Sequence, residues 1–246
     1  DDFSAWPGLD AGLVKGMEDR LIGRADVLLA TSQKLYERLA RSGKPVYMLT
    51  HGVDIGLFGR DVPAEHPCLE GLPRPRAGYF GLFDERTDKG LLRALAQRMP
   101  DFSFVLTGRV ETPVDELRAL PNVRFTGPLP YGDLPALIAG LDVLLLPYTP
   151  NEFADTLSPL KLKEYLATGR PVVSTPIAEA RRMGQYVSLA RSVDDWETAL
   201  RNGLTADVQQ RKQSLAVALG EETWAAKAAR LRAICLEALE RRRGHA

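Results

Sequence analysis

The stretch LSPLKLKEYLATGRPVVSTPI, residues 157–177, contains a complete helix-to-strand unit. Ser158 is expected to cap the helix, and Pro159 to take its first position, where a missing N–H group costs nothing. Gly169 is expected to end the helix, and the apolar residues of PVVST then predict a buried strand. A helix followed so closely by a strand is typical of α/β proteins.

Short apolar runs of the same kind recur on both sides of this unit. They are apolar at successive positions, which predicts parallel strands that are covered on both faces. The runs occupy residues 25–32, 46–50, 77–81, 102–108, 123–127, 142–147 and 171–175.

Helical patterns separate these runs, at residues 32–43, 89–100, 131–142 and 158–169. Ser32 is expected to cap the first of them and Gly43 to end it. The chain from Val193 onward is expected to be helical, with an amphipathic last segment that ends in arginines. Strands and helices in regular alternation predict right-handed crossovers and a doubly wound, Rossmann-like parallel sheet.

Composition excludes several classes of protein. The chain has 246 residues, and 32 Lys and Arg side chains balance 32 Asp and Glu, so no overall field attracts nucleic acid or anionic lipid. The longest apolar run, LDVLLLPY, is too short to cross a bilayer, and no signal peptide is visible. Cys68 and Cys235 form no disulfide or metal pattern, which favours a reducing compartment. A glycine-rich dinucleotide fingerprint and a P-loop are both absent from the sequence.

The start of the helix at residues 158–169 suggests an anion site. The N–H groups of Leu160, Lys161 and Leu162 are expected to point out of its N-terminal end, where the helix dipole is positive. Lys161 opposes that dipole unless an anion binds there, and Glu164, one turn on, could accept two vicinal hydroxyl groups. Glu164 is expected to be exposed without ligand. Spacing alone favours a surface salt bridge between Lys161 and Glu164, worth about 0.3 kcal/mol.

Together with other segments in a fixed order, this stretch resembles the group 1 glycosyltransferases, which have the GT-B fold. The segments are DDFSAWPG, ADVLLATSQKLYERL, HGVDIGLF, GYFGLFDERTDKGLL and LPNVRFTGPLPYGDLPALIAGLDVLLLPY. The similarity covers essentially the whole chain and is strongest to the bacterial branch that assembles polysaccharides. It implies a retaining enzyme that stabilises its leaving group with cations and helix dipoles, without a bound metal or cofactor.

The resemblance also assigns roles to residues. It implies that Glu164 binds the ribose of a nucleotide and that Ser158, Pro159, Leu160 and Lys161 face its diphosphate. It further implies that Pro128 and Leu129 lie against the base. Gly81 follows a strand, and without a Cβ it would let the backbone approach a ligand closely. The candidates for stabilising the leaving group are Arg86, Lys89 and Lys161.

This sequence departs from the family pattern at several positions. Leu82 stands where the family usually has an arginine, and Arg86 is either its replacement or a solvated loop charge. Thr156 stands where the family often has an acid near the sugar, and Glu152 and Asp155 are the nearby alternatives. His51 replaces the usual asparagine and is expected in a hinge or turn. Tyr131 and Asp133 are expected at the start of a helix, and Trp224 in the packing of the terminal helices.

The resemblance divides the chain at about residue 55. Residues 1–55 are expected to be a remnant of an N-terminal acceptor domain, and residues 56–246 the donor-binding domain, with a hinge in the Gly- and Pro-rich segment 51–76. The chain is thus expected to be the C-terminal half of a cytoplasmic enzyme, at the inner face of the membrane, and inactive alone. That enzyme would move a sugar from a UDP-linked donor to a saccharide or lipid-linked acceptor, and membrane contact would come from the missing half.

Two other functions remain open from the sequence. A nucleotide-sugar 2-epimerase would share the fold, although that class usually has more acidic and histidine side chains in its cleft. A non-catalytic domain that binds a nucleotide or a partner protein is the second alternative, and the residues at Leu82 and Thr156 favour it.

Overall fold

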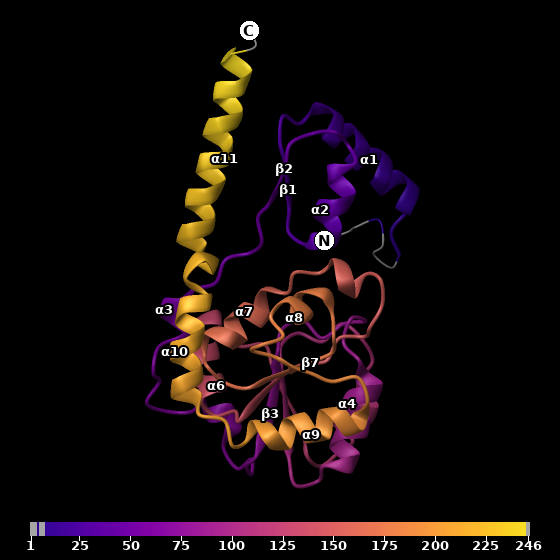
Figure 1. Ribbon diagram of the computed structural model, residues 1–246. Helices are drawn as coiled ribbons and strands as arrows, with labels where there is room; N and C mark the ends of the chain where they lie inside the picture. The colour runs from indigo at the N-terminus through magenta and orange to yellow at the C-terminus, as the bar shows by residue number, and fades with distance from the viewer. Residues whose placement is uncertain (1–3, 5–7, 245–246) are drawn as a thin grey trace.

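The computed structural model of the chain describes Ser4 and residues 8–244, so most of the DDFSAWPG segment lies outside the described residues. Figure 1 shows a larger unit and a smaller one above it, with a long C-terminal helix that runs from the larger unit beside the smaller. The larger unit contains a six-stranded sheet, and the smaller unit contains a separate two-stranded sheet.

The six strands of the larger unit are all parallel and lie in the order β5-β4-β3-β6-β7-β8. Numbered from the first strand of this unit, the order is 3-2-1-4-5-6, the arrangement of a doubly wound dinucleotide-type sheet. The prediction of fold class is therefore confirmed. The strands are β3 (Arg76–Phe80), β4 (Ser103–Thr107), β5 (Val123–Gly127), β6 (Val143–Leu146), β7 (Val172–Ser174) and β8 (Ser188–Leu189).

Helices cover both faces of this sheet, which explains why its central strands read as unbroken apolar runs. Leu92 of α4 (Lys89–Arg98) and Trp196 of α9 (Val193–Gly203) belong to the core on one face. The core on the other face receives apolar residues from α6 (Leu134–Ala139), α7 (Leu160–Ala167) and α10 (Val208–Ala218). Shorter helical segments are α3 (Ile55–Phe58), η2 (Pro67–Leu69), α5 (Asp115–Arg118), η3 (Tyr131–Asp133), η4 (Ala154–Thr156), α8 (Ala178–Arg182) and η5 (Gly220–Glu222).

The smaller unit consists of α1 (Ala11–Arg24), β1 (Leu28–Ala30), α2 (Gln33–Ala40) and β2 (Val46–Met48), with β1 and β2 parallel. Ser32 caps α2, because its side chain accepts a hydrogen bond from the amide of Leu35, as predicted. Helix α1 was not expected from the sequence. Leu28, Ala30, Leu35 and Leu39 form a small core of their own.

Two chain segments join the units and run side by side. The amide of Val53 donates to the carbonyl of Glu222 at 2.8 Å, and Val53 pairs with Thr223 in a parallel bridge. The predicted hinge segment 51–76 is well packed, because Phe58 in α3 is only 2% exposed within the main core. Gly52 lies so close to Trp224 that a Cβ there would sit 2.6 Å from the indole.

Helix α11 (Trp224–Gly244) returns from the larger unit to the smaller one. Arg241 donates to the hydroxyl of Tyr47 at 2.5 Å, and that hydroxyl lies 3.3 Å from a carboxylate oxygen of Glu237. Arg242 lies 3.4 Å from Asp26. The end of α11 therefore contacts the smaller unit, beside which it runs in Figure 1.

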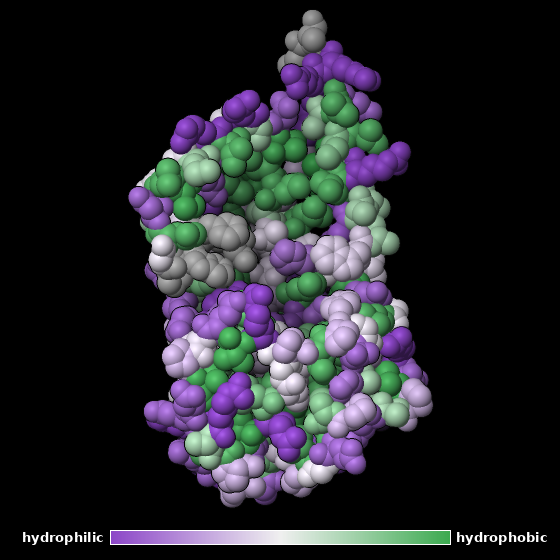
Figure 2. Space-filling model, turned by 180° about the vertical axis from the view of Figure 1, so that it is seen from behind, coloured by the Kyte–Doolittle hydropathy of each residue, from purple (hydrophilic) through white to green (hydrophobic). Residues whose placement is uncertain are grey.

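The smaller unit exposes a broad apolar face, drawn in green in the upper half of Figure 2. Helix α1 contributes Leu13, Met17 and Leu21, which are 59%, 54% and 69% exposed. Their spacing of four residues places them on one side of the helix. Across the described part of the chain, no helix combines the length and apolarity needed to cross a membrane.

Candidate functional site

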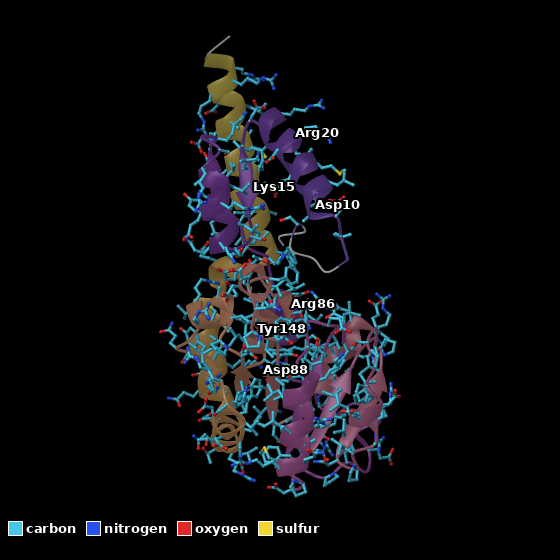
Figure 3. The ribbon with its side chains drawn as sticks, turned by 90° about the vertical axis from the view of Figure 1, so that its right-hand side faces the viewer. Asp10, Lys15, Arg20, Arg86, Asp88 and Tyr148 are labelled. Carbon is cyan, nitrogen blue, oxygen red and sulfur yellow. The ribbon has the colours of Figure 1, made fainter. Side chains whose placement is uncertain are left out.

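A cavity of about 440 Å³ opens where the order of strands reverses, between the ends of β3 and β6 and the start of α7. Ligands of doubly wound sheets bind at this place, beyond the carboxyl ends of the strands. Figure 3 shows two of the lining residues, Arg86 and Tyr148, at the end of the larger unit that lies nearest the smaller unit. The cavity is lined by His51, Phe80, Gly81, Leu82, Arg86, Tyr131, Leu134, Tyr148, Leu157, Ser158, Pro159, Leu160, Lys161 and Glu164.

Lys161 supplies a cation without a carboxylate partner. It takes part in none of the ion pairs found within Ser4 and residues 8–244. Its ammonium lies 2.7 Å from the hydroxyl of Tyr79, 4.2 Å from the centre of that ring and 5.4 Å from the ring of Tyr148. The alternative of a surface salt bridge between Lys161 and Glu164 is therefore not found among the described residues. A cation in the first turn of α7, beside the positive end of the helix dipole, favours binding of an anion.

Helix α7 begins at Leu160, two residues after the predicted cap at Ser158. The predicted cap is wrong: Pro159 takes the cap position with an extended backbone, and no side chain caps the helix. Within the described part of the chain, the amides of Leu160 and Lys161 donate to no acceptor. Both residues line the cavity, so these N–H groups add to the anion site that the sequence suggested.

Glu164 is buried, with 4% of its surface exposed, so the expectation of an exposed carboxylate is wrong. Its Oε1 accepts a hydrogen bond from the hydroxyl of Tyr131 at 2.8 Å. Tyr131 reaches it from η3, where the ring packs edge-on against Phe58. Burial raises the pKa of Glu164, while the Tyr131 hydroxyl and Lys161 act in the opposite direction.

Gly81 and Arg86 lie in the cavity, where the sequence placed them. Gly81 has φ of +133°, which side-chain-bearing residues rarely adopt, and a Cβ there would lie 2.4 Å from the ammonium of Lys161, which would have to move. The Arg86 guanidinium is 2.7 Å from Asp84, which neutralises much of its charge. Leu82, in the family's arginine position, lines the cavity with an apolar side chain.

Lys89, Pro128 and Leu129 do not line this cavity. Asp88 caps α4, because its side chain accepts a hydrogen bond from the amide of Leu91. The ammonium of Lys89 lies 3.4 Å from a carboxylate oxygen of Glu85, and Lys89 lines a separate hollow between α4 and α5. Pro128 and Leu129 directly follow β5, and Leu129 packs partly against the main core. Contact of this segment with a base stays a prediction.

The acids considered for the sugar side also lie outside the cavity lining. Asp155 accepts the amide of Ala178 at 2.9 Å and a guanidinium nitrogen of Arg181 at 2.7 Å, so it holds the start of α8. Glu152 contacts Lys34 through its backbone carbonyl oxygen, which accepts a hydrogen bond from the ammonium. Thr156 is 2% exposed, and its hydroxyl donates to the carbonyl of Phe153.

Four residues with polar side chains in or beside the cavity were not identified from the sequence as binding residues: His51, Tyr79, Tyr131 and Tyr148. Burial, followed by the charge of Lys163, lowers the pKa of His51, which favours a neutral imidazole at the cavity wall. Tyr131 begins η3, as expected, but the hydrogen bond from its hydroxyl to Glu164 could not be predicted from the sequence. Asp133 lies at the start of α6, without a capping hydrogen bond.

No cluster of three or more His, Cys, Asp or Glu suited to a metal ion occurs among the described residues. The arrangement instead offers a fixed ammonium and two free amides at the start of α7, and a buried carboxylate one turn deeper. Such a site can hold a diphosphate at the helix end and a hydroxyl-bearing group beside Glu164.

Comparisons with known proteins show the family of the chain. The family model of the "Glycosyl transferases group 1" matches residues 74–206, more than half of the chain. TuaH of Bacillus subtilis, whose name describes a teichuronic acid biosynthesis glycosyltransferase, is 30% identical over 180 residues, 70% of this chain and 45% of TuaH. A GDP-mannose-dependent alpha-mannosyltransferase of Mycolicibacterium smegmatis is 30% identical over 198 residues, 78% of this chain and 51% of that protein.

Solved structures show the same fold at low sequence identity. Anabaena Alr3699/HepE in complex with UDP has a TM-score of 0.75 and 15% identity. The match covers 95% of this chain and 70% of the Anabaena chain. Sucrose-phosphate synthase from Thermosynechococcus elongatus has a TM-score of 0.73 and 17% identity. The match covers 93% of this chain and 62% of the synthase. These neighbours share the GT-B fold that the resemblance implied.

The chain therefore belongs to the group 1 glycosyltransferase family. It spans about half the length of the curated relatives that it matches.

Proposed function

We propose that the cavity at the start of α7 binds the diphosphate and ribose of a nucleotide-sugar donor. The observation that carries this proposal is Lys161, an ammonium with no carboxylate partner among the described residues, held at a helix N-terminus that also presents free amides. Glu164, one turn deeper, is the acceptor for the ribose hydroxyl groups. This geometry supports the role that the family resemblance assigned to both residues.

The enzyme to which this chain belongs would transfer the sugar to a saccharide or lipid-linked acceptor in the synthesis of a cell-surface polysaccharide. The bond between the anomeric carbon and the β-phosphate oxygen breaks, and the acceptor hydroxyl supplies the new glycosidic oxygen and releases its proton. Negative charge develops on the leaving diphosphate. Lys161 and the start of α7 lie where they can stabilise it, which is the main contribution of these residues to catalysis. Retention at the anomeric carbon is implied by the resemblance.

The relatives support this function at different levels of detail. TuaH is named for teichuronic acid biosynthesis, which supports a polysaccharide acceptor. UDP is present in the Anabaena structure, which supports a uridine nucleotide. The mycobacterial relative depends on GDP-mannose, so GDP is the competing ligand and belongs in the same experiment.

Calorimetric titration of the 246-residue chain with UDP, GDP and uridine tests the proposal. Lys161→Gln should weaken UDP binding about 10- to 100-fold, the effect of losing one charged hydrogen bond, and should leave uridine binding unchanged. Lys89→Gln is the matched control, because it removes an equal charge that lies outside the cavity. No binding of either nucleotide, or equal losses in the two variants, would contradict the proposal.

Product analysis distinguishes transfer from epimerisation. Within the described cavity lining, Glu164 is the single carboxylate and is bonded to Tyr131, and His51 is the single imidazole, so these two groups are the candidates for acid–base chemistry on a sugar carbon. A 2-epimerised donor among the products would overturn the assignment as a transferase.

A further inference from the structure

Tyr79, at the end of β3, connects the cavity to the sheet beneath it. The side chain is 1% exposed, and its ring packs edge-on against Phe83. Its hydroxyl lies 2.6 Å from the carbonyl oxygen of Leu82 and 2.7 Å from the ammonium of Lys161. A carbonyl can only accept and an ammonium can only donate, so both bond directions are fixed. The hydroxyl donates to Leu82, and its oxygen accepts from Lys161.

The surroundings of Lys161 leave little other support for the ammonium. The helix dipole of α7 repels a cation in the first turn, and no ion pair among the described residues holds it. The Tyr79 oxygen accepts from the ammonium at 2.7 Å, the hydroxyl of Tyr148 interacts with the same ammonium, and the faces of both rings add cation–π attraction. Gly81 leaves the room that the ammonium occupies.

We propose that Tyr79 is a positioning residue that holds Lys161 ready to meet the diphosphate of the donor. This inference rests on the proposed function of the cavity. The departure from the family pattern at Leu82 leaves this arrangement intact, because the backbone carbonyl of Leu82, and not its side chain, orients Tyr79. Preorganisation of this kind strengthens binding, since a flexible lysine does not have to be ordered when the anion arrives.

The test is Tyr79→Phe, which keeps the ring and removes only the hydroxyl. UDP binding, measured by calorimetry on the whole chain, should weaken about five- to tenfold, whereas uridine binding should be unchanged. Tyr165→Phe is the matched control. It removes another buried hydroxyl, which accepts the amide of Phe80 at 3.1 Å, and Lys161 is not its partner.

A double-mutant cycle with Lys161→Gln separates positioning from a general structural effect. If Tyr79 acts through Lys161, adding Tyr79→Phe to Lys161→Gln should cause no further loss of UDP affinity. Additive losses, equal losses for UDP and uridine, or a Tyr79→Phe variant that no longer folds would each overturn the inference. If the wild-type chain does not bind UDP, the proposed function fails as well. If Lys161→Gln weakens UDP binding and Tyr79→Phe does not, the inference alone fails.

Discussion

Glu164 is a carboxylate in a place that suits a neutral group better. Burial raises its pKa above the ordinary value of 4.5, so the folded chain holds a proton there more readily than the unfolded chain. The free energy of unfolding therefore falls as the pH rises from 4.5 through the raised pKa. At neutral pH the carboxylate lowers stability, a cost typical of residues that are needed for binding.

Glu164→Gln should consequently raise the free energy of unfolding at pH 7.5, because the amide removes the buried charge and its oxygen still accepts from Tyr131. This gain in stability should disappear near pH 4, because that pH lies below the pKa of the Glu164 carboxyl in the unfolded chain. Urea denaturation at the two pH values measures this difference. Glu152→Gln, at an exposed glutamate, is the control and should change neither value. A variant no more stable than wild type at pH 7.5 would refute the account.

The binding role of the same carboxylate makes a separate prediction. Glu164→Ala should weaken both UDP and uridine binding about 10- to 100-fold, since the ribose is common to the two ligands. This pattern differs from that expected for Lys161→Gln, which spares uridine. Calorimetry with both ligands distinguishes them, and an unchanged affinity for uridine would remove Glu164 from the ribose site.

Part of the site could be predicted at the level of single residues. Gly81, Lys161 and Glu164 belong to segments whose local pattern already suggests a ligand, and the cavity contains all three. Tyr79 and Tyr131 could not be identified in this way, because a tyrosine in a buried strand or a turn reads as a packing residue. Their hydroxyl groups acquire a role only when the fold brings them to Lys161 and Glu164.

Elements with a clear apolar pattern were predicted well from the sequence. All seven predicted strands are present, and Val123–Gly127 agrees to the residue. Helix α1 was missed because Gly12, Gly16 and Gly23 lower its helix propensity. Strand β8 is two exposed residues long, too short for any periodicity. The start of α7 was misplaced because Ser-Pro imitates a cap, whereas Pro159 itself remains extended.

Three elements meet at Glu222, beside the segments that join the two units. Its Oε2 lies 2.5 Å from the ammonium of Lys163 in α7 and 2.9 Å from that of Lys227 in α11. Thr50 donates to the same oxygen. Burial acts to raise the pKa of Glu222, but the hydrogen bonds from the two lysines outweigh it and lower the pKa to about 2.

Glu222→Gln should lower the free energy of unfolding at pH 7 by about 3 kcal/mol, because Lys163, 1% exposed, loses its counter-ion. A carboxyl with a lowered pKa stabilises the fold above its unfolded pKa, so the advantage of wild type should decline between pH 4.5 and pH 2. Denaturation curves at pH 7, 4 and 2 follow this decline. Glu221→Gln, at the exposed neighbouring residue, serves as the control. If wild type were more stable than Glu222→Gln by the same amount at every pH, the ion pair could not be the cause of the difference.

At the scale of the whole molecule, we expect the apolar face of α1 to promote association between copies of the chain. Met17 lies at the centre of the stripe and is 54% exposed, and exposed apolar faces of this kind promote association. Met17→Lys should reduce light scattering at high protein concentration without changing affinity for UDP, because α1 contributes no residue to the cavity lining. Scattering unaffected by the substitution would show that another surface is responsible.

The return of α11 to the smaller unit limits how the chain can be cut into fragments. A fragment that starts at residue 56 keeps α11 but removes Tyr47 and Asp26, the partners of Arg241 and Arg242. A fragment that stops at residue 223 keeps those partners and loses the helix. Either boundary therefore separates groups that are in contact in the intact chain. For the same reason, a protease nick between the units should leave both products held together until denaturant is added, and they should co-elute in gel filtration.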